Sequence, residues 1–117
     1  MQKLEVFGAK KLKGQINISG SKNASLPILA ATLLSSKKIH LNNLPKVNDI
    51  KTMIDLLQSL GSKIKFNKKK LIIDNSKQNK QFASYSLLKT MRAGILVLGP
   101  LLAKLGKAKV SLPGGCA

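Results

Sequence analysis

A helical repeat of apolar residues occupies the middle of the chain, over residues 47–60. The members of this repeat are Val47, Ile50, Met53, Ile54, Leu57 and Leu60. Their spacing of three and four residues places them on one face of a helix. Gly61 follows directly and is typical of the position just after a helix end. The repeat therefore predicts an amphipathic helix with a buried apolar face.

Two strands and a second helix are predicted before this repeat. Residues 4–7 favour a strand, and residues 12–18 favour another because apolar and polar side chains alternate there. A helix is predicted over residues 23–34, with Asn23 as its N-cap. Pro27 is compatible with this helix only in the first turn.

Strand patterns also flank the central repeat on both sides. Residues 37–41 predict a short strand before it. Residues 63–66 and 71–74 predict a hairpin after it, across the basic turn at residues 67–70. The polar segment 75–81 that follows is predicted to be a loop.

A long apolar segment completes the pattern. Its helical spacing predicts a helix over residues 84–105, kinked or divided at Pro100 and ended by Gly106. The second half of this helix is apolar on every side, so we expect it to be buried. A final strand is predicted over residues 107–112.

The order of these elements predicts an α/β fold, with one complete six-element unit and the start of a second. A Lys-rich strand that ends in Leu-Pro follows an apolar helix twice, at residues 37–45 and 107–113. This recurrence is a weak indication of internal repetition. The second unit is expected to be incomplete.

The chain is strongly basic, with a formal net charge of +17. This charge favours a nucleic-acid or anionic-membrane partner. However, the cations are almost all lysines scattered along the chain, and aromatic residues make up 3% of it. Proteins that read bases depend on arginine and stacking aromatics. The single cysteine is compatible with a reducing cytosol, and the apolar run 93–103 is too short to cross a bilayer.

Cys116 lies at the tip of a Gly-Gly turn and is a candidate nucleophile or proton donor. The alternative is an incidental thiol near a chain end. The one histidine, His40, falls in or beside a predicted strand, where a structural or surface role is the usual one. A Cys–His dyad therefore has no support from the pattern.

Lys22 and Asn23 follow a Gly-Ser turn that opens a helix. Free backbone N–H groups and the helix dipole favour an anion at such a position, and Lys22 adds a full charge. A phosphate or carboxylate site is one interpretation. A capped helix with a solvated lysine is the other.

Arg92 is the one arginine, and its planar guanidinium suits bidentate recognition of an anion. Its partner is either a bound anionic ligand or one of the four acids, Glu5, Asp49, Asp55 and Asp74. The sequence shows no metal-ligand spacing, no paired carboxylates and no glycine-rich nucleotide motif. The candidate site groups that remain are cations and one thiol, and this set suits a negatively charged substrate such as a phosphate ester or a nucleotide sugar.

Three blocks of the chain resemble one enzyme family, the UDP-N-acetylglucosamine 1-carboxyvinyltransferases. They are GSKNA with LPI at residues 20–24 and 26–28, KTMRA with LGPL at 89–93 and 98–101, and VSLPGGC at 110–116. The resemblance implies transfer of the enolpyruvyl group of phosphoenolpyruvate to the 3-hydroxyl of UDP-N-acetylglucosamine in peptidoglycan (cell wall) synthesis. It implies a cytoplasmic enzyme that acts by addition and elimination, without a metal or organic cofactor, a nucleic-acid partner or a membrane.

The resemblance also implies roles for individual residues. Lys22 would contact the phosphoenolpyruvate anion, and Asn23 would contact the reacting region of the sugar. Arg92 would orient the ligand on the nucleotide-sugar side. Cys116 would act as general acid at the enolpyruvyl methylene, would be able to bond to it, and would be the residue that fosfomycin alkylates.

The family fold implied by the resemblance is an inside-out α/β barrel, with two domains of three βαβαββ units each. On that template residues 1–19 are strands that belong with a second domain, and residues 20–117 form an incomplete first domain. The remainder of the protein would supply a further phosphoenolpyruvate-binding arginine and the catalytic acid, so we expect the chain alone to be inactive. The alternatives are the sister transferase that acts on shikimate 3-phosphate and a small basic nucleic-acid-binding protein.

Overall fold

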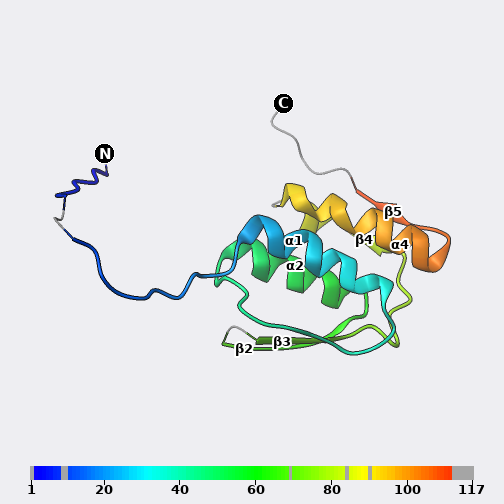
Figure 1. The fold of residues 1–117 in the computed structure, drawn as a ribbon. Coiled ribbons are helices and arrows are strands. Elements are labelled where there is room, and N and C mark those ends of the chain that lie inside the picture. Colours follow the sequence, from blue (N-terminus) through cyan, green and yellow to red (C-terminus); the bar gives the residue numbers. More distant parts are fainter. Residues whose placement is uncertain (1, 9–10, 69, 84, 90, 112–117) are drawn as a thin grey trace.

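The computed structural model describes residues 2–8, 11–68, 70–83, 85–89 and 91–111. This part of the chain contains both helices and strands, in mixed order (Figure 1). The elements up to the hairpin are α1 (Lys22–Ala31), η1 (Thr32–Leu34), β1 (Ile39–Leu41), α2 (Asn48–Ser59), β2 (Lys63–Asn67) and β3 (Lys70–Asp74). Those after it are β4 (Phe82–Ala83), α3 (Tyr85–Leu88), η2 (Arg92–Val97), α4 (Leu98–Leu105) and β5 (Lys109–Val110).

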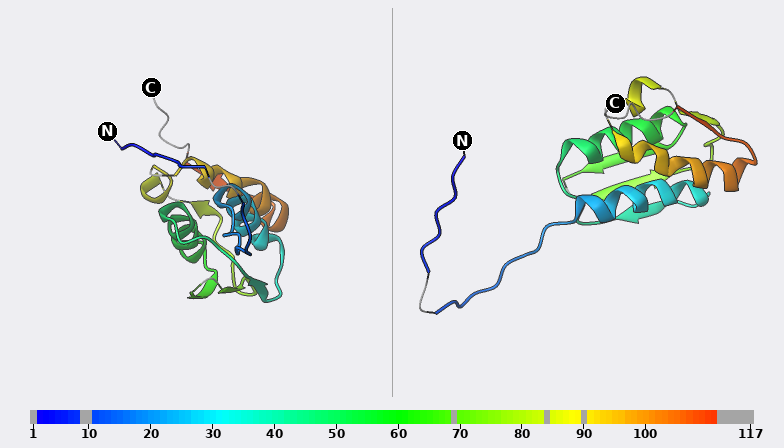
Figure 2. Two further views of the ribbon diagram at one scale, coloured as in Figure 1. Left: turned by 60° about the vertical axis from the view of Figure 1, so that its left-hand side comes forward. Right: turned by 90° about the horizontal axis from the view of Figure 1, so that it is seen from above.

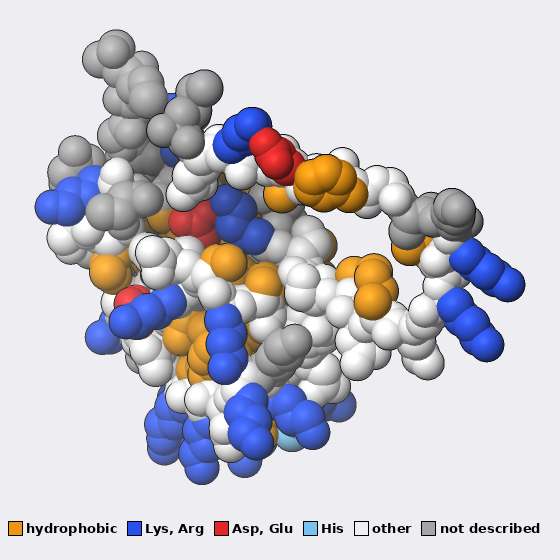
Figure 3. All heavy atoms as spheres, turned by 90° about the vertical axis from the view of Figure 1, so that its left-hand side faces the viewer, with side chains coloured by type: hydrophobic (Ala, Val, Ile, Leu, Met, Phe, Trp, Pro, Cys, Tyr) orange, Lys and Arg blue, Asp and Glu red, His pale blue; other side chains and the backbone are white. Residues whose placement is uncertain are grey.

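The main sheet has the strand order β1-β3-β2. Both outer strands run antiparallel to β3, so β1 and β2 are parallel and α2 is the crossover between them. Period-two alternation buries Leu71 and Ile73 of β3 on the face that α1 and α2 cover (Figures 1 and 2). The opposite face of the sheet is open and carries a group of lysines (Figure 3).

One apolar core joins the helices to this sheet. Aliphatic side chains fill it almost entirely, as the low aromatic content requires. Its fully buried members with the largest side chains are Leu29, Leu33, Ile50, Met53, Leu56, Leu57, Leu60, Leu71, Ile73, Leu88, Leu101 and Val97. The central helix and the hairpin predicted from the sequence are therefore confirmed, with the apolar face of α2 buried as expected.

The first helix begins earlier than predicted. Ser21, and not Asn23, is its N-cap, because the Ser21 hydroxyl oxygen accepts a 3.3 Å hydrogen bond from the backbone N–H of Ala24. Pro27 consequently lies in the second turn of α1, where it removes one helical hydrogen bond. The segment closes with the 3₁₀ turn η1, so the predicted end at residue 34 is confirmed.

The prediction of strands at residues 4–7 and 12–18 is wrong for this structure. Residues 2–8 and 11–20 carry no strand, and the segment before residue 18 extends away from the body of the protein (Figure 1). Within the described ranges, no strand lies alongside them to pair with their backbone. Leu12, Ile16 and Ile18 are 89%, 82% and 77% exposed, so the alternating pattern finds no apolar surface to cover. The assignment of residues 1–19 to a second domain stays a prediction.

The single long helix predicted over residues 84–105 is also wrong. The segment is divided into α3, η2 and α4, and the break falls near Met91, which is extended (φ −143°, ψ 108°). Pro100 is the third residue of α4, and the helix continues past it to Leu105, so Pro100 does not divide it. In α4, Leu101 is buried, whereas Leu98 and Leu102 are exposed. The prediction that this half of the segment is buried on every side is therefore also wrong.

A second small sheet pairs β4 with β5 in parallel. Strand β5 confirms the predicted final strand over the two residues that pair, whereas β4 was not predicted. The loop at residues 75–81 is confirmed as a loop, but Asn75 and Gln78 within it are buried. The parallel strands β4 and β5 are joined through α3, η2 and α4. Because residues 12–18 form no strand, the six-element unit predicted from the element order lacks its first strand in this structure.

Candidate functional site

A cleft of about 310 Å³ lies where three helical segments begin. Lys22 is the first residue of α1, Asp49 is the second residue of α2, and Arg92 is the first residue of η2. The residues that line the cleft are Lys22, Asn23, Leu26, Asp49, Met91, Arg92 and Ala93. Two blocks more than 60 residues apart in sequence, around Lys22 and Arg92, are thus brought together.

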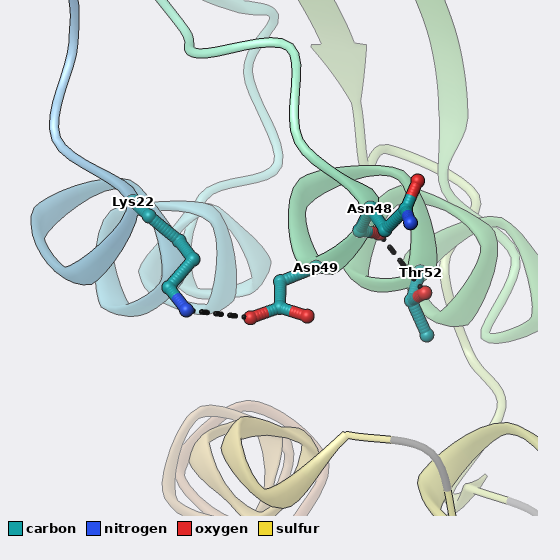
Figure 4. A network of polar contacts seen from close by, with 4 residues as sticks. All are labelled: Lys22, Asn48, Asp49 and Thr52. Carbon is teal, nitrogen blue, oxygen red and sulfur yellow. Dashed lines mark hydrogen bonds and ion pairs between the residues drawn. The ribbon is translucent and has the colours of Figure 1, made fainter. Parts of the chain in front are cut away.

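Lys22 and Asp49 form an ion pair across the cleft (Figure 4). The Lys22 Nζ and Asp49 Oδ2 atoms are 2.9 Å apart, and the two side chains are 48% and 41% exposed. A pair this accessible to water contributes little to stability, roughly 0.2–1 kcal/mol. The pair matters because it holds the ammonium of Lys22 at the cleft.

The local backbone favours an anion in this cleft. The first N–H groups of a helix have no partner within it and carry partial positive charge. In α1 the Ser21 cap takes the N–H of Ala24, and in α2 the Val47 cap makes no side-chain hydrogen bond. Lys22 and Arg92 add two full positive charges, and among the described lining residues Asp49 is the one acid. The arrangement can bind a phosphate or carboxylate group.

Three of the four predicted site residues therefore line one cleft, namely Lys22, Asn23 and Arg92. Their roles toward a ligand stay predictions. The fourth, Cys116, lies outside the described residues. Sequence reasoning missed Asp49 as a site residue and named it only as one candidate partner of Arg92; its place in the first turn of a helix was the available signal.

His40 lies elsewhere, on β1 and exposed. It lines the open face of the main sheet with Lys38, Lys63, Lys65 and Asp74. The backbone N–H of Ser76 lowers the pKa of the Asp74 carboxyl, and the nearby Lys38 and Lys63 contribute in the same direction. This basic face is separate from the cleft.

The described residues contain neither a candidate metal centre nor a candidate membrane span. Within those residues, no three His, Cys, Asp or Glu side chains come close enough to hold a metal ion. None of the helices in the described ranges combines the length and apolar character needed to cross a membrane.

Comparison with known proteins finds a matching family and similar relatives. The model of the EPSP synthase (3-phosphoshikimate 1-carboxyvinyltransferase) family matches residues 6–117. A UDP-N-acetylglucosamine 1-carboxyvinyltransferase of Pelagibacter ubique (strain HTCC1062) is 81% identical over 117 residues, which are 100% of this chain and 28% of that protein. One of the same name from Rickettsia felis is 55% identical over 121 residues, covering 100% of this chain and 29% of the relative. The chain thus spans less than a third of the length of these relatives.

A solved structure supports the fold. The enolpyruvyl transferase NikO from Streptomyces tendae superposes with a TM-score of 0.69 at 17% identity, covering 82% of this chain and 22% of that one. A likeness at this identity shows the fold alone. It confirms the predicted class, an α/β fold of the enolpyruvyl transferase type.

Proposed function

Because the chain belongs to the EPSP synthase (3-phosphoshikimate 1-carboxyvinyltransferase) family, we propose that it carries part of the active site of a UDP-N-acetylglucosamine 1-carboxyvinyltransferase. The observation that carries this proposal is the single cleft lined by Lys22, Asn23 and Arg92. In the proposed reaction, the enolpyruvyl group of phosphoenolpyruvate passes to the 3-hydroxyl of UDP-N-acetylglucosamine, and phosphate leaves. The product would enter peptidoglycan synthesis.

Lys22 is proposed to bind the phosphoenolpyruvate anion. Its ammonium stands at the start of α1, where its charge adds to that of the helix N-terminus. A fixed positive charge that is in place before the reaction stabilises the charge that develops on the substrate and on the departing phosphate. Such groups act most strongly in the transition state, so Lys22 is expected to affect kcat as well as KM.

Asn23 and Arg92 are proposed to hold the nucleotide sugar. The Asn23 amide can both donate to and accept from a sugar hydroxyl. The Arg92 guanidinium offers a planar pair of donors, which suits a phosphate or carboxylate oxygen pair. Since both residues line the cleft that Lys22 enters, the two substrates would meet there.

Cys116 is proposed to supply the proton in the addition step. The sugar 3-hydroxyl would lose its proton to a base as its oxygen bonds to the central carbon of phosphoenolpyruvate, while the thiol gives its proton to the methylene carbon. Elimination would then break the bond to phosphate and return one methyl proton to the thiolate, which restores the carbon–carbon double bond; the hydroxyl proton would leave with the phosphate. Nearby cations lower the pKa of a thiol, which keeps it able to exchange protons near neutral pH. No cofactor or metal enters this scheme.

Two alternatives receive less support. The sister reaction on shikimate 3-phosphate shares the family, but the relatives with 81% and 55% identity are named for UDP-N-acetylglucosamine. The Gly-Gly-Cys block also favours the nucleotide-sugar enzyme. Nucleic-acid binding rests on net charge alone. We place the proposed reaction in the cytoplasm, apart from membranes and nucleic acids, which is compatible with the lone cysteine.

The test is a full-length chimera in which residues 1–117 replace the matching segment of the Pelagibacter ubique relative. Mass spectrometry would follow the enolpyruvyl product with UDP-N-acetylglucosamine and, separately, with shikimate 3-phosphate as acceptor. We expect turnover with the nucleotide sugar, and a loss of kcat/KM of about 100-fold or more in Lys22→Ala. The unmodified relative is the positive control. Turnover with shikimate 3-phosphate alone, or none with either acceptor, would contradict the proposal.

A further inference from the structure

Asp49 occupies an unexpected place for a cleft that binds an anionic substrate. It is the one acid among the described lining residues, and its carboxylate lies 2.9 Å from the ammonium of Lys22 (Figure 4). A negative charge at this position repels an incoming anion. Attraction between the charges of the cleft and an anionic substrate therefore does not explain why an acid lies there.

The two partners differ in rigidity. Asp49 has a short side chain in the first turn of α2, and the next residue, Ile50, is buried in the core with Met53 one turn on. Lys22 carries its charge on a flexible four-carbon stem that loses about 2 kcal/mol of rotamer freedom when it is fixed. The carboxylate is thus the fixed member of the pair, and the lysine is the member that it orders.

The geometry leaves Lys22 able to bind a ligand at the same time. An ammonium group has three N–H donors, and the contact with Asp49 Oδ2 uses one of them. The other donors remain available for a phosphate or carboxylate oxygen. If the Lys22 side chain is already ordered before the substrate arrives, substrate binding does not have to include the cost of fixing that side chain.

We propose that Asp49 is a positioning residue, which holds the ammonium of Lys22 at the cleft for the anionic substrate. This inference rests on the function proposed above, and it adds a residue that acts through Lys22 and does not touch the substrate. The proposal also predicts the direction in which neutralisation of Asp49 changes the reaction. If Asp49 acted only by its charge, its neutralisation would improve binding of an anion. As a positioning residue, its neutralisation impairs the reaction.

The experiment compares Asp49→Asn with the unaltered chimera of residues 1–117 described above. We expect kcat/KM for phosphoenolpyruvate to fall about tenfold. The matched control is Asp55→Asn, the same change at an exposed position of α2 outside the cleft, which should leave kcat/KM unchanged. Asp49→Glu keeps the charge at the helix N-terminus and should retain more activity than Asp49→Asn.

A double-mutant cycle separates positioning from general loss of structure. In the Lys22→Ala background, Asp49→Asn should have no further effect on kcat/KM, because the group that Asp49 positions is absent. Melting temperatures of all variants are measured alongside. An equal tenfold loss in both backgrounds would overturn the inference, as would unchanged or improved kcat/KM in Asp49→Asn, or a Glu variant weaker than the Asn variant.

These outcomes are distinct from failure of the proposed function. If the unaltered chimera does not turn over phosphoenolpyruvate with UDP-N-acetylglucosamine, the proposed function is contradicted and the inference fails with it. If the chimera is active and Asp49→Asn behaves like Asp55→Asn, only the role of Asp49 is refuted.

Discussion

The side-chain amide of Asn75 donates a 2.7 Å hydrogen bond to the carbonyl oxygen of Thr32, and both residues are buried. The bond joins the end of β3 to the end of the first helical segment. The backbone carbonyl of Asn75 in turn accepts a 3.1 Å hydrogen bond from the ammonium of Lys104 on α4. One loop residue therefore links three elements of the body that carries the cleft.

Asn75→Ala should destabilise the fold. It removes a buried hydrogen bond and leaves the Thr32 carbonyl with the backbone N–H of Ser35 as its remaining donor, which costs about 0.5–1.5 kcal/mol of unfolding free energy. Urea unfolding followed by circular dichroism measures this cost. Asn79→Ala, at an exposed position of the same loop, is the control and should stay within about 0.5 kcal/mol of the unaltered chain. Equal effects of the two substitutions would contradict the role of Asn75.

Gly20→Ala should disturb the start of α1. A Cβ at residue 20 would collide with the backbone carbonyl oxygen of Asn43, so the chain must shift next to the Ser21 cap and Lys22. We expect a loss of about 1–3 kcal/mol of unfolding free energy and reduced activity in the chimera.

Gly99→Ala is the matched control for this substitution. A Cβ there meets no atom within 4 Å, and residue 99 lies in α4. Alanine in a helix should stabilise the fold by about 0.5–1 kcal/mol. Thermal unfolding of both variants measures the contrast, and a Gly20 variant as stable as the Gly99 variant would refute the close contact.

Asp74 should make stability depend on pH in the acid range. The backbone N–H of Ser76 donates a 2.9 Å hydrogen bond to Asp74 Oδ1 and lowers the pKa of the carboxyl below its usual 3.8. A carboxyl whose pKa is lower in the folded state stabilises the fold above the unfolded-state pKa, and the contribution is lost as pH falls through the folded-state value.

Asp74→Asn should remove this part of the acid destabilisation. The measurement is urea unfolding of both chains at about pH 7 and about pH 3. The Asn variant should lose less stability between the two conditions than the unaltered chain. The same loss in both chains would show that the Asp74 contact does not respond to pH.

The exposed apolar residues of the N-terminal segment should promote self-association. Leu12, Ile16 and Ile18 are all more than three-quarters exposed and alternate with polar residues, so the backbone beside them can pair with another copy. Ile16→Lys with Ile18→Lys should lower the sedimentation coefficient measured at micromolar concentration. An unaltered chain that sediments as a monomer would contradict this prediction.

The sequence predicts best where local pattern and packing agree. Residues 47–60 have helical periodicity, and α2 buries that face against the sheet. The hairpin of β2 and β3 also follows from alternation across a short basic turn. The residues at 12–18 have a clear alternating pattern, but a strand needs backbone partners, and the described chain supplies none.

Non-local contacts explain the remaining errors. Leucines at helical spacing predict one helix over residues 84–105, whereas the structure turns at Met91 so that Leu88 and Met91 are both buried. Gly94 packs directly against the Leu88 side chain, where a Cβ would collide with Leu88 Cδ2. Sequence reasoning found Lys22, Asn23 and Arg92 from their charge and motif. It missed the pairing of Asp49 with Lys22, because charge patterns do not reveal which helix starts lie together.

The crystal structure of the chimera with UDP-N-acetylglucosamine and phosphoenolpyruvate tests the central claim most directly. The account predicts that anionic groups of the two ligands lie within about 2.7–3.2 Å of Lys22 Nζ and of the Arg92 guanidinium, in the cleft that both residues line. Ligands bound at another place in the protein, with no contact to either side chain, would contradict it.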